Sequence, residues 1–283
     1  MNSWFIRHWP KPVQWTATEN KNIHSYLFKK HWIAIHFESI TDWESDVYPT
    51  RAGKSAIRLL NELRKEGGIV CVDYPVIGEM YVGEVKKGQL QNSFRSNLSS
   101  KRPILKYLKL NKPRKVSGHA RTFFRTLSGQ GTIKHWPSLH GVLPYFYKHG
   151  KLPRVREALL PAQLETICQE YLRDNQGMLR LLWPIGRSMP DIDIVGINKK
   201  GKNIYAQVTH ANTKAKLKPK LDKLLSYKGK GICVFFCPQS DDSKAIQKKY
   251  LSIKFIWTDQ KVWKWLCLRK NTKYMKSLLS WLS

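Results

Sequence analysis

The sequence predicts an α/β protein with two parts: an α+β domain over residues 1–150 and a mixed-sheet α/β sandwich over residues 151–283. Two observations favour this class. Short apolar runs of strand length alternate with segments of helical periodicity through the second half of the chain. The length of 283 residues also exceeds one typical domain of roughly 100 to 150 residues. The turn-forming stretch Gly-Lys-Leu-Pro, which starts at Gly150, is the best point of division.

The chain carries a large excess of positive charge. Fifty Lys and Arg face twenty Asp and Glu, which gives a formal net charge of +30, well beyond what solubility needs. Such a charge favours a polyanionic partner, and nucleic acid is the usual one. A membrane surface or an acidic protein would also attract it, but neither predicts the acidic hairpin described below.

The cysteines and the apolar runs bear on location. Five cysteines are scattered through apolar segments without a Cys-x-x-Cys pair, which favours reduced thiols in the cytoplasm. No apolar run approaches the roughly 18 to 20 residues that cross a bilayer. We therefore expect a cytoplasmic protein that does not bind a membrane.

The N-terminal half begins with a mixture of aromatic and basic residues over residues 4–16, which predicts either a covered flank of the domain or an arm that stacks on bases. Residues 31–37 form an apolar strand, and residues 53–66 carry apolar side chains at helical spacing. Residues 69–74 and 79–85 add two more strands. A strand, a helix and a strand pair predict a small compact barrel.

Three short strand segments in this half carry a resemblance to a known class. Trp-Ile-Ala-Ile-His-Phe, Gly-Gly-Ile-Val-Cys-Val-Asp-Tyr and Tyr-Val-Gly-Glu-Val resemble the pattern of PUA-like or EVE-like domains. The resemblance implies that this domain recognises nucleic acid, including a modified base stacked on aromatic side chains. The candidates are Trp32, Trp43, Tyr48, Tyr74 and Trp136, and packing in the core is the alternative for each.

Residues 101–115 interleave basic and apolar side chains. This pattern suits a strand or ribbon laid along a phosphate backbone, and a solvated face gives it equally. The predicted nucleic-acid contacts in this stretch are Lys106, Lys109, Arg114 and Lys115.

The C-terminal half starts with a predicted helix at residues 154–173, whose apolar side chains recur on one face. A short strand at residues 179–185 follows. Further strands are predicted at residues 191–197, 203–209, 231–237 and 253–258, and further helices from Pro219 through Leu225, at residues 243–250 and at residues 262–268. The alternation predicts a mixed sheet flanked by helices.

The hairpin formed by the strands at residues 191–197 and 203–209 holds the chemically active side chains. Alternate strand residues share a face, so Asp191 and Asp193 point one way, and a hairpin brings Asp193 near Gln207. Carboxylate and amide oxygens, with water in the remaining positions, are ligands that Mg²⁺ takes. Such an ion polarises a phosphoryl oxygen and supplies a hydroxide. An ordinary amphipathic hairpin with a solvated acidic end is the alternative.

This hairpin resembles the second and third motifs of the restriction-endonuclease-like PD-(D/E)XK nucleases, closest to the Mrr-like branch, in which Gln can replace the acidic residue of the third motif. The order of elements over residues 155–270 fits the same family. The sequence departs from the motif after Val208, where Thr209 stands in place of the usual Lys. The candidates to supply the missing donor are Lys214, Lys216 and Lys218.

The resemblance implies a Mg²⁺-dependent DNA endonuclease of the restriction or defence type, in a modification-dependent form if the first domain recognises a modified base. Asp193 would bind the ion, with Asp191 as the alternative first ligand, and Gln207 would contribute its side-chain oxygen. Glu165 on the preceding helix would complete the site or orient its waters. Thr209 or a nearby Lys would orient the attacking water.

The implied partner is double-stranded DNA. Arg187 would contact the scissile phosphate, and Lys214, Lys216, Lys218 and Lys220 would lie along the backbone. Cutting both strands implies a homodimer on DNA. Two alternatives stay open: a nucleic-acid-binding protein that has lost catalysis, which the missing motif Lys favours, and a nuclease subunit that needs a partner.

Overall fold

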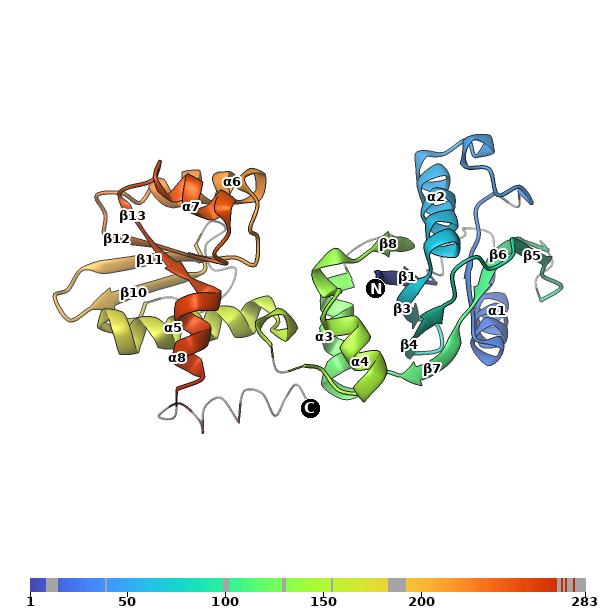
Figure 1. The fold of residues 1–283 in the computed structure, drawn as a ribbon, viewed down its shortest axis with the longest axis horizontal. Helices are drawn as coiled ribbons and strands as arrows, with labels where there is room; N and C mark the ends of the chain where they lie inside the picture. Colours follow the sequence, from blue (N-terminus) through green and yellow to red (C-terminus); the bar gives the residue numbers. More distant parts are fainter. Residues whose placement is uncertain are drawn as a thin grey trace. The chain divides into compact units, whose positions relative to one another are not determined.

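The chain folds into two compact units that divide between Ala158 and Leu159. The fold is that of a computed structural model, shown in Figure 1. It describes residues 1–8, 15–38, 40–98, 102–128, 131–153, 155–182 and 192–268, together with residues 271, 273 and 277. Each unit contains helices and at least one sheet, and the mixed sheets confirm the predicted α/β class.

The strands of the first unit form two sheets. A five-stranded sheet has the order β7-β4-β3-β1-β8, with β1 (Ser3–Arg7), β3 (Gly68–Tyr74), β4 (Glu79–Val85), β7 (Asn111–Lys115) and β8 (Ile133–His135). A three-stranded antiparallel sheet has the order β2-β6-β5, with β2 (Trp32–Ile35), β5 (Asn92–Arg95) and β6 (Ile104–Lys109). The strands predicted as one barrel divide between two sheets because the consecutive strands β6 and β7 pair with different partners. In the larger sheet, only β1 and β3 are parallel.

The first unit has four described α-helices, of which the first two begin at side-chain caps. They are α1 (Ala17–Lys30), α2 (Arg51–Glu66), α3 (Gly118–Ser128) and α4 (Val142–His149), with short 3₁₀ turns η1 (Ser45–Val47), η2 (Pro137–Leu139) and η3 (Arg156–Ala158). The Thr16 hydroxyl accepts the Glu19 N–H, and the Glu19 carboxylate accepts the Thr16 N–H. The Thr50 hydroxyl accepts the Gly53 N–H. The helix predicted from residue 53 therefore begins at Arg51.

Several aromatic residues are buried in the largely aliphatic core of the first unit. Trp4 and Phe5 of β1 are fully buried, so the start of the aromatic and basic segment is a central strand; residues 9–14 lie outside the described residues. Among the candidates for base stacking, the side chains of Trp43, Tyr48, Tyr74 and Trp136 are also buried. Trp32 is half-buried and stacks on Tyr107 with ring centroids 3.9 Å apart. Core packing therefore accounts for four of the five candidates.

The second unit is built on a mixed five-stranded sheet of order β13-β12-β11-β10-β9. Its strands are β9 (Met178–Leu181), β10 (Ile194–Asn198), β11 (Asn203–Val208), β12 (Ile232–Cys237) and β13 (Ile253–Trp257). β9, β10 and β11 pair antiparallel, and β11, β12 and β13 pair parallel. β9 covers the start of the predicted strand at residues 179–185 and ends at Leu181, and residues 183–185 lie outside the described residues.

Helices cover both faces of this sheet. They are α5 (Pro161–Gln176), α6 (Lys214–Leu225), α7 (Asp241–Gln247) and α8 (Trp263–Leu266), and a π turn, η4 (Thr258–Val262), precedes α8. Leu217 and Leu221 of α6 pack in one cluster with Phe235 of β12. On the other face, Tyr171 of α5 contacts Phe236 with centroids 6.4 Å apart. Figure 1 shows α6 and α7 on one side of the sheet and α5 and α8 on the other, as a sandwich requires.

Helix α6 differs from its prediction. The helix begins at Lys214 after the N-cap Thr213, and Pro219 lies inside it, whereas the sequence predicts a start at Pro219. The reason is the buried face, which already includes Leu217 before the proline. Proline in the second turn removes only one intrahelical hydrogen bond.

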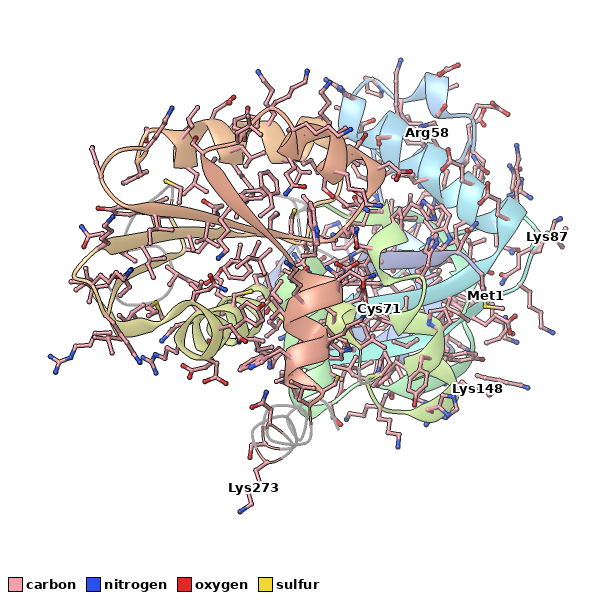
Figure 2. The ribbon with its side chains drawn as sticks, turned by 60° about the vertical axis from the view of Figure 1, so that its left-hand side comes forward. Met1, Arg58, Cys71, Lys87, Lys148 and Lys273 are labelled. Atoms are coloured by element: carbon pink, nitrogen blue, oxygen red, sulfur yellow. The ribbon has the colours of Figure 1, made fainter. Side chains whose placement is uncertain are left out.

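The surface carries the excess charge. Side chains such as Arg58 and Lys87 point outward, and Cys71 is buried inside the first unit (Figure 2). None of the described helices combines the length and the apolar character that crossing a membrane requires.

Candidate active site

Asp193 and Gln207 meet at the end of the β10–β11 hairpin. Ile194 lies opposite Ala206, and the Asp193 N–H donates to the Ala206 carbonyl at 3.0 Å, so the pairing continues to Asp193. The Asp193 Oδ2 atom accepts hydrogen bonds from the Gln207 Nε2 atom and, at 2.6 Å, from the Val208 N–H. The strand alternation thus brings the predicted carboxylate and amide together.

The surroundings of this pair exclude most of the solvent. Gln207 is only 5% exposed. Burial raises the pKa of the Asp193 carboxyl, whereas the Val208 N–H and the positive charge of Lys220 act in the opposite direction. A carboxylate at this position is therefore costly without cations nearby.

Glu165 belongs to the same electrostatic environment. It lies in the second turn of α5 and is half-buried. Burial and then the charge of Asp193 raise the pKa of Glu165 to about 7, against the charge of Lys220. The start of α5 is fixed by Pro161 in the first turn and by the Gln163 side chain, which accepts the Leu160 N–H at 2.8 Å. The helix thereby directs a second carboxyl group toward the environment of Asp193.

Lys220 is the cation that acts on both carboxyl groups. It is half-buried on α6, whereas the three lysines predicted to replace the motif Lys are exposed. Lys218 lies 3.8 Å from the Asp222 carboxylate. Helical spacing indicates this difference: Lys220 follows the buried Leu217 by three residues and precedes the buried Leu224 by four. The sequence prediction assigns Lys220 only to DNA contact and misses this role.

The donor set suits a hard divalent cation. Asp193, Glu165 and Gln207 offer two carboxylates and an amide oxygen, which with water are the ligands of Mg²⁺. No group of three or more His, Cys, Asp or Glu that could hold a metal occurs among the residues that the structure describes. A cation here would therefore need the Gln207 oxygen and water. Two carboxyl groups with raised pKa values form an environment that a divalent cation stabilises.

Comparison with known proteins assigns no family. No family model and no curated protein matches the chain. A repair endonuclease from Pyrococcus abyssi matches 64% of this chain and 73% of its own at 13% identity, with a TM-score of 0.24. A structure of an EndoMS-dsDNA2 complex matches 68% of this chain and 65% of its own at 9% identity, with a TM-score of 0.26. Likeness at this level carries no argument, so the site rests on its own geometry.

Of three further predicted residues near the hairpin, the structure describes only Thr209. Thr209 is buried, its hydroxyl accepts the Ala211 N–H at 3.1 Å, and its own N–H donates to the Phe236 carbonyl. The Thr209 hydroxyl thus holds the turn after β11. Asp191 and Arg187 lie outside the described residues.

The placement of Lys106 corrects its prediction as a nucleic-acid contact. Lys106 is only 2% exposed, and its Nζ atom donates to the Ile40 carbonyl. Burial lowers its pKa to about 8, against the charge of Asp42. The reason is strand alternation, which places Lys106 on the same face of β6 as the buried Ile104 and Leu108.

Five further predicted nucleic-acid contacts are exposed on the surface. In the first unit, Lys109 is exposed, as are Arg114, which donates to the Tyr147 carbonyl at 3.0 Å, and Lys115, which pairs with Glu79 at 2.9 Å. In the second unit, Lys214 and Lys216 are exposed at the start of α6. These side chains are accessible to a polyanion.

Proposed function

We propose that this protein is a Mg²⁺-dependent DNA endonuclease that hydrolyses phosphodiester bonds. The observation that carries the proposal is the contact between Asp193 and Gln207 at a buried hairpin end. A solvated acidic hairpin would leave the carboxylate in water, whereas here burial raises its pKa. A buried carboxylate, a second carboxyl group and a cation together favour a reactive site.

Each residue has a proposed role. Asp193, Gln207 and Glu165 would hold Mg²⁺, with Asp191 as the alternative first ligand. When bound, the ion supplies charge that polarises a phosphoryl oxygen and acidifies a water. The Val208 N–H orients the Asp193 carboxylate. Lys220 favours the ionised forms of both carboxyl groups and stabilises negative charge that develops on the phosphate.

The proposed substrate is double-stranded DNA. The net charge of +30 supplies attraction to phosphate, and the exposed lysines of α6 (Lys214, Lys216 and Lys218) lie on the helix that also carries Lys220. A site on this helix would place phosphate contacts next to the carboxyl groups.

We extend the proposal to a cytoplasmic restriction or defence enzyme of the Mrr-like type that acts as a homodimer on DNA. Gln207 in place of an acidic motif residue supports that branch. The first unit would select the site in the manner of a PUA-like domain, with modified DNA as one form of the substrate.

One observation favours a second candidate, a binding protein without catalysis. The Gln207 amide already donates to Asp193, so the carboxylate has protein partners without a metal ion. A nuclease subunit that cuts only with a partner protein is the third candidate.

Plasmid cleavage separates these functions. The full chain is incubated with modified and with unmodified plasmid, in Mg²⁺ and in EDTA. The proposal expects nicked or linear DNA in Mg²⁺ only, and none with Asp193→Ala. Asp46→Ala, which removes an exposed carboxylate of the first unit, is the matched control and should cut normally. Tight, salt-sensitive binding of plasmid that stays intact would favour the second candidate, and cleavage only after a co-purified protein is added would favour the third.

A further inference from the structure

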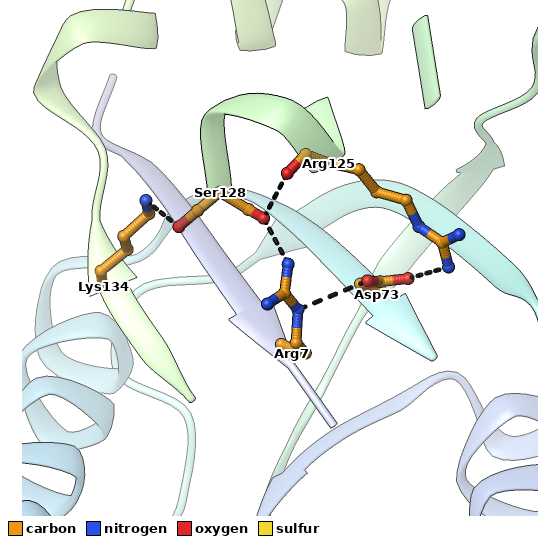
Figure 3. A network of polar contacts seen from close by, with 5 residues as sticks. All are labelled: Arg7, Asp73, Arg125, Ser128 and Lys134. Carbon is orange, nitrogen blue, oxygen red and sulfur yellow. Dashed lines mark hydrogen bonds and ion pairs between the residues drawn. The ribbon is translucent and has the colours of Figure 1, made fainter. Parts of the chain in front are cut away.

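A cluster of cations lies where the two parallel strands of the first unit end. Arg7 is the last residue of β1 and pairs in register with Asp73 near the end of β3. Arg125 and Ser128 reach the same place from the last turns of α3, and Lys134 reaches it from β8 (Figure 3). Ligands of α/β sheets commonly bind at the carboxyl ends of strands.

Asp73 is the carboxylate that joins two of these cations. Arg125 Nη2 lies 2.8 Å from Asp73 Oδ1, and Arg7 Nε lies 3.5 Å from Asp73 Oδ2. The Asp73 side chain is only 3% exposed. Arg7 Nη2 also donates to the Ser128 hydroxyl, and Lys134 Nζ donates to the carbonyls of Leu127, at 3.2 Å, and Ser128. Two of the three cations therefore pair with Asp73, while Lys134 contacts only backbone carbonyls. One carboxylate among three cations leaves an excess of two positive charges.

Two arginines of α3, one in the cluster and one beside it, have guanidinium donors without a partner among the described residues. Arg125 Nε is buried without a hydrogen-bond partner among the described residues, and so is Arg121 Nε. The two arginines are four residues apart on α3 and therefore lie on the same face of the helix. A side chain added at Gly78 would place its Cβ atom 3.8 Å from Arg121 Nη2, so Arg121 lies beside the turn between β3 and β4. Buried donors without acceptors are costly, and an anion would satisfy both.

We propose that Arg121 and Arg125, with Arg7 and Lys134 beside them, bind a phosphate group of a nucleic acid. The inference rests on the proposed nucleic-acid partner and locates a contact in the first unit. Guanidinium groups match phosphate because their N–H groups donate to two phosphate oxygens at once. The Arg125 side chain is 37% exposed and that of Arg7 is 17% exposed, so a phosphate can approach this edge. Asp73 holds Arg125 through Nη2, and the Arg125 Nε donor has no partner among the described residues.

The lowered pKa of Lys134 supports the binding of an anion at this place. Burial and then the charge of Arg7 lower the pKa of Lys134. Two cations therefore repel each other in a half-buried position, and bound phosphate would relieve that repulsion.

Binding of labelled oligonucleotides to the full chain in EDTA tests the proposal. One oligonucleotide carries a 5′-phosphate and the other a 5′-hydroxyl. Arg121→Gln should weaken binding about tenfold, as the loss of a charge-assisted phosphate contact does. Arg51→Gln, which removes an exposed cation of α2, is the matched control and should have a smaller effect. A loss confined to the 5′-phosphate oligonucleotide identifies a terminal phosphate, and an equal loss for both identifies backbone phosphate. Equal affinities for Arg121→Gln and Arg51→Gln would overturn the proposal.

A second measurement needs no nucleic acid. Inorganic phosphate should raise the Tm of the wild-type chain, and it should raise the Tm of Arg121→Gln and of Arg125→Lys less. Arg125→Lys keeps a positive charge opposite Asp73 but removes the Nε donor. Equal phosphate-induced shifts for wild type and both variants would contradict the site. Both measurements are made without Mg²⁺ and therefore do not depend on cleavage. If Asp193→Ala loses cleavage but still binds phosphate, the substitution has changed the proposed nuclease site and not the phosphate site.

Discussion

Gln207 donates its side-chain amide to the Asp193 carboxylate across two neighbouring antiparallel strands. The Val208 N–H donates to the same carboxylate oxygen at 2.6 Å. Asp193 is therefore held by two consecutive residues of β11, and its orientation is fixed by the protein itself. A carboxylate oriented in this way is ready to take a cation without rearrangement of the strands.

Gln207→Glu tests the role of this amide. The substitution places a second carboxyl group against Asp193, and buried like charges oppose each other. In EDTA at pH 8, we expect the free energy of unfolding to fall by about 1 to 2 kcal/mol. Mg²⁺ should then stabilise the variant more than the wild type, as measured by urea denaturation. Gln247→Glu at the exposed end of α7 is the control, and an equal Mg²⁺ response in all three proteins would argue against a cation between these residues.

Glu165→Gln tests how far the ionised Glu165 carboxylate lowers the stability of the folded state. The pKa of Glu165 is raised from 4.5 to about 7, so the ionised side chain lowers the stability of the folded state. This cost is absent below the ordinary pKa, grows as the pH rises from 4.5 to 7, and is fully present above 7. At pH 8 in EDTA, we expect the variant to be about 1 kcal/mol more stable than the wild type, a value reduced because Glu165 is half-exposed.

The same variant separates stability from activity. Cleavage by Glu165→Gln should fall on the order of 100-fold, because the site loses a metal-binding carboxylate. Urea denaturation at pH 4.5 and pH 8 provides the comparison. If the difference in stability between variant and wild type is the same at both pH values, Glu165 does not titrate as the structure indicates.

Lys220→Met tests the cation beside the carboxyl groups. The single-turnover cleavage rate should fall on the order of 100-fold, since charge stabilisation at the phosphate is lost. Lys216→Met, the control, removes an exposed lysine of the same helix. It should weaken DNA binding by a small factor and leave the single-turnover rate unchanged. Equal rates in the two variants would remove Lys220 from the site.

Lys106→Met tests whether Lys106 is buried on β6 and therefore does not contact DNA. Because Lys106 is buried, its replacement should leave DNA affinity unchanged, whereas Lys109→Gln on the exposed face should weaken it. The lowered pKa also fixes the direction of a stability change. The protonated ammonium costs stability below about pH 8, and that cost is lost as the pH rises from 8 to 10.5. The wild type should therefore gain stability relative to Lys106→Met over this range, and a DNA-binding defect in Lys106→Met equal to that of Lys109→Gln would contradict the placement.

Local patterns account for the parts of the fold that could be predicted. Period-two alternation in β10 and β11 places Asp193 and Gln207 on one face, and their contact follows from the hairpin. The apolar run of β12 predicts a central strand, and β12 pairs on both sides. In these elements the local pattern and the tertiary environment agree.

Other features depend on contacts that local patterns do not contain. β1 is central because it pairs with β3 and β8, which are distant in sequence. Helix α1 buries the polar Asn20 and His24 beside Ile23 and Leu27, so its apolar periodicity is weak.

The positions of two lysines depend on the tertiary fold. Lys106 faces inward although lysine is rarely buried. Lys220 acts on Asp193 and Glu165 although α6 and α5 lie on opposite sides of the sheet. Neither placement follows from local sequence patterns.

Binding of Mn²⁺, a spectroscopic substitute for Mg²⁺, tests the proposed metal site most directly. Electron paramagnetic resonance of the full chain should detect bound Mn²⁺ that Mg²⁺ displaces. The bound signal should disappear in Asp193→Ala, weaken in Gln207→Leu, and persist in the control Asp46→Ala. Equal Mn²⁺ binding by wild type and Asp193→Ala would contradict a cation site at the Asp193–Gln207 contact.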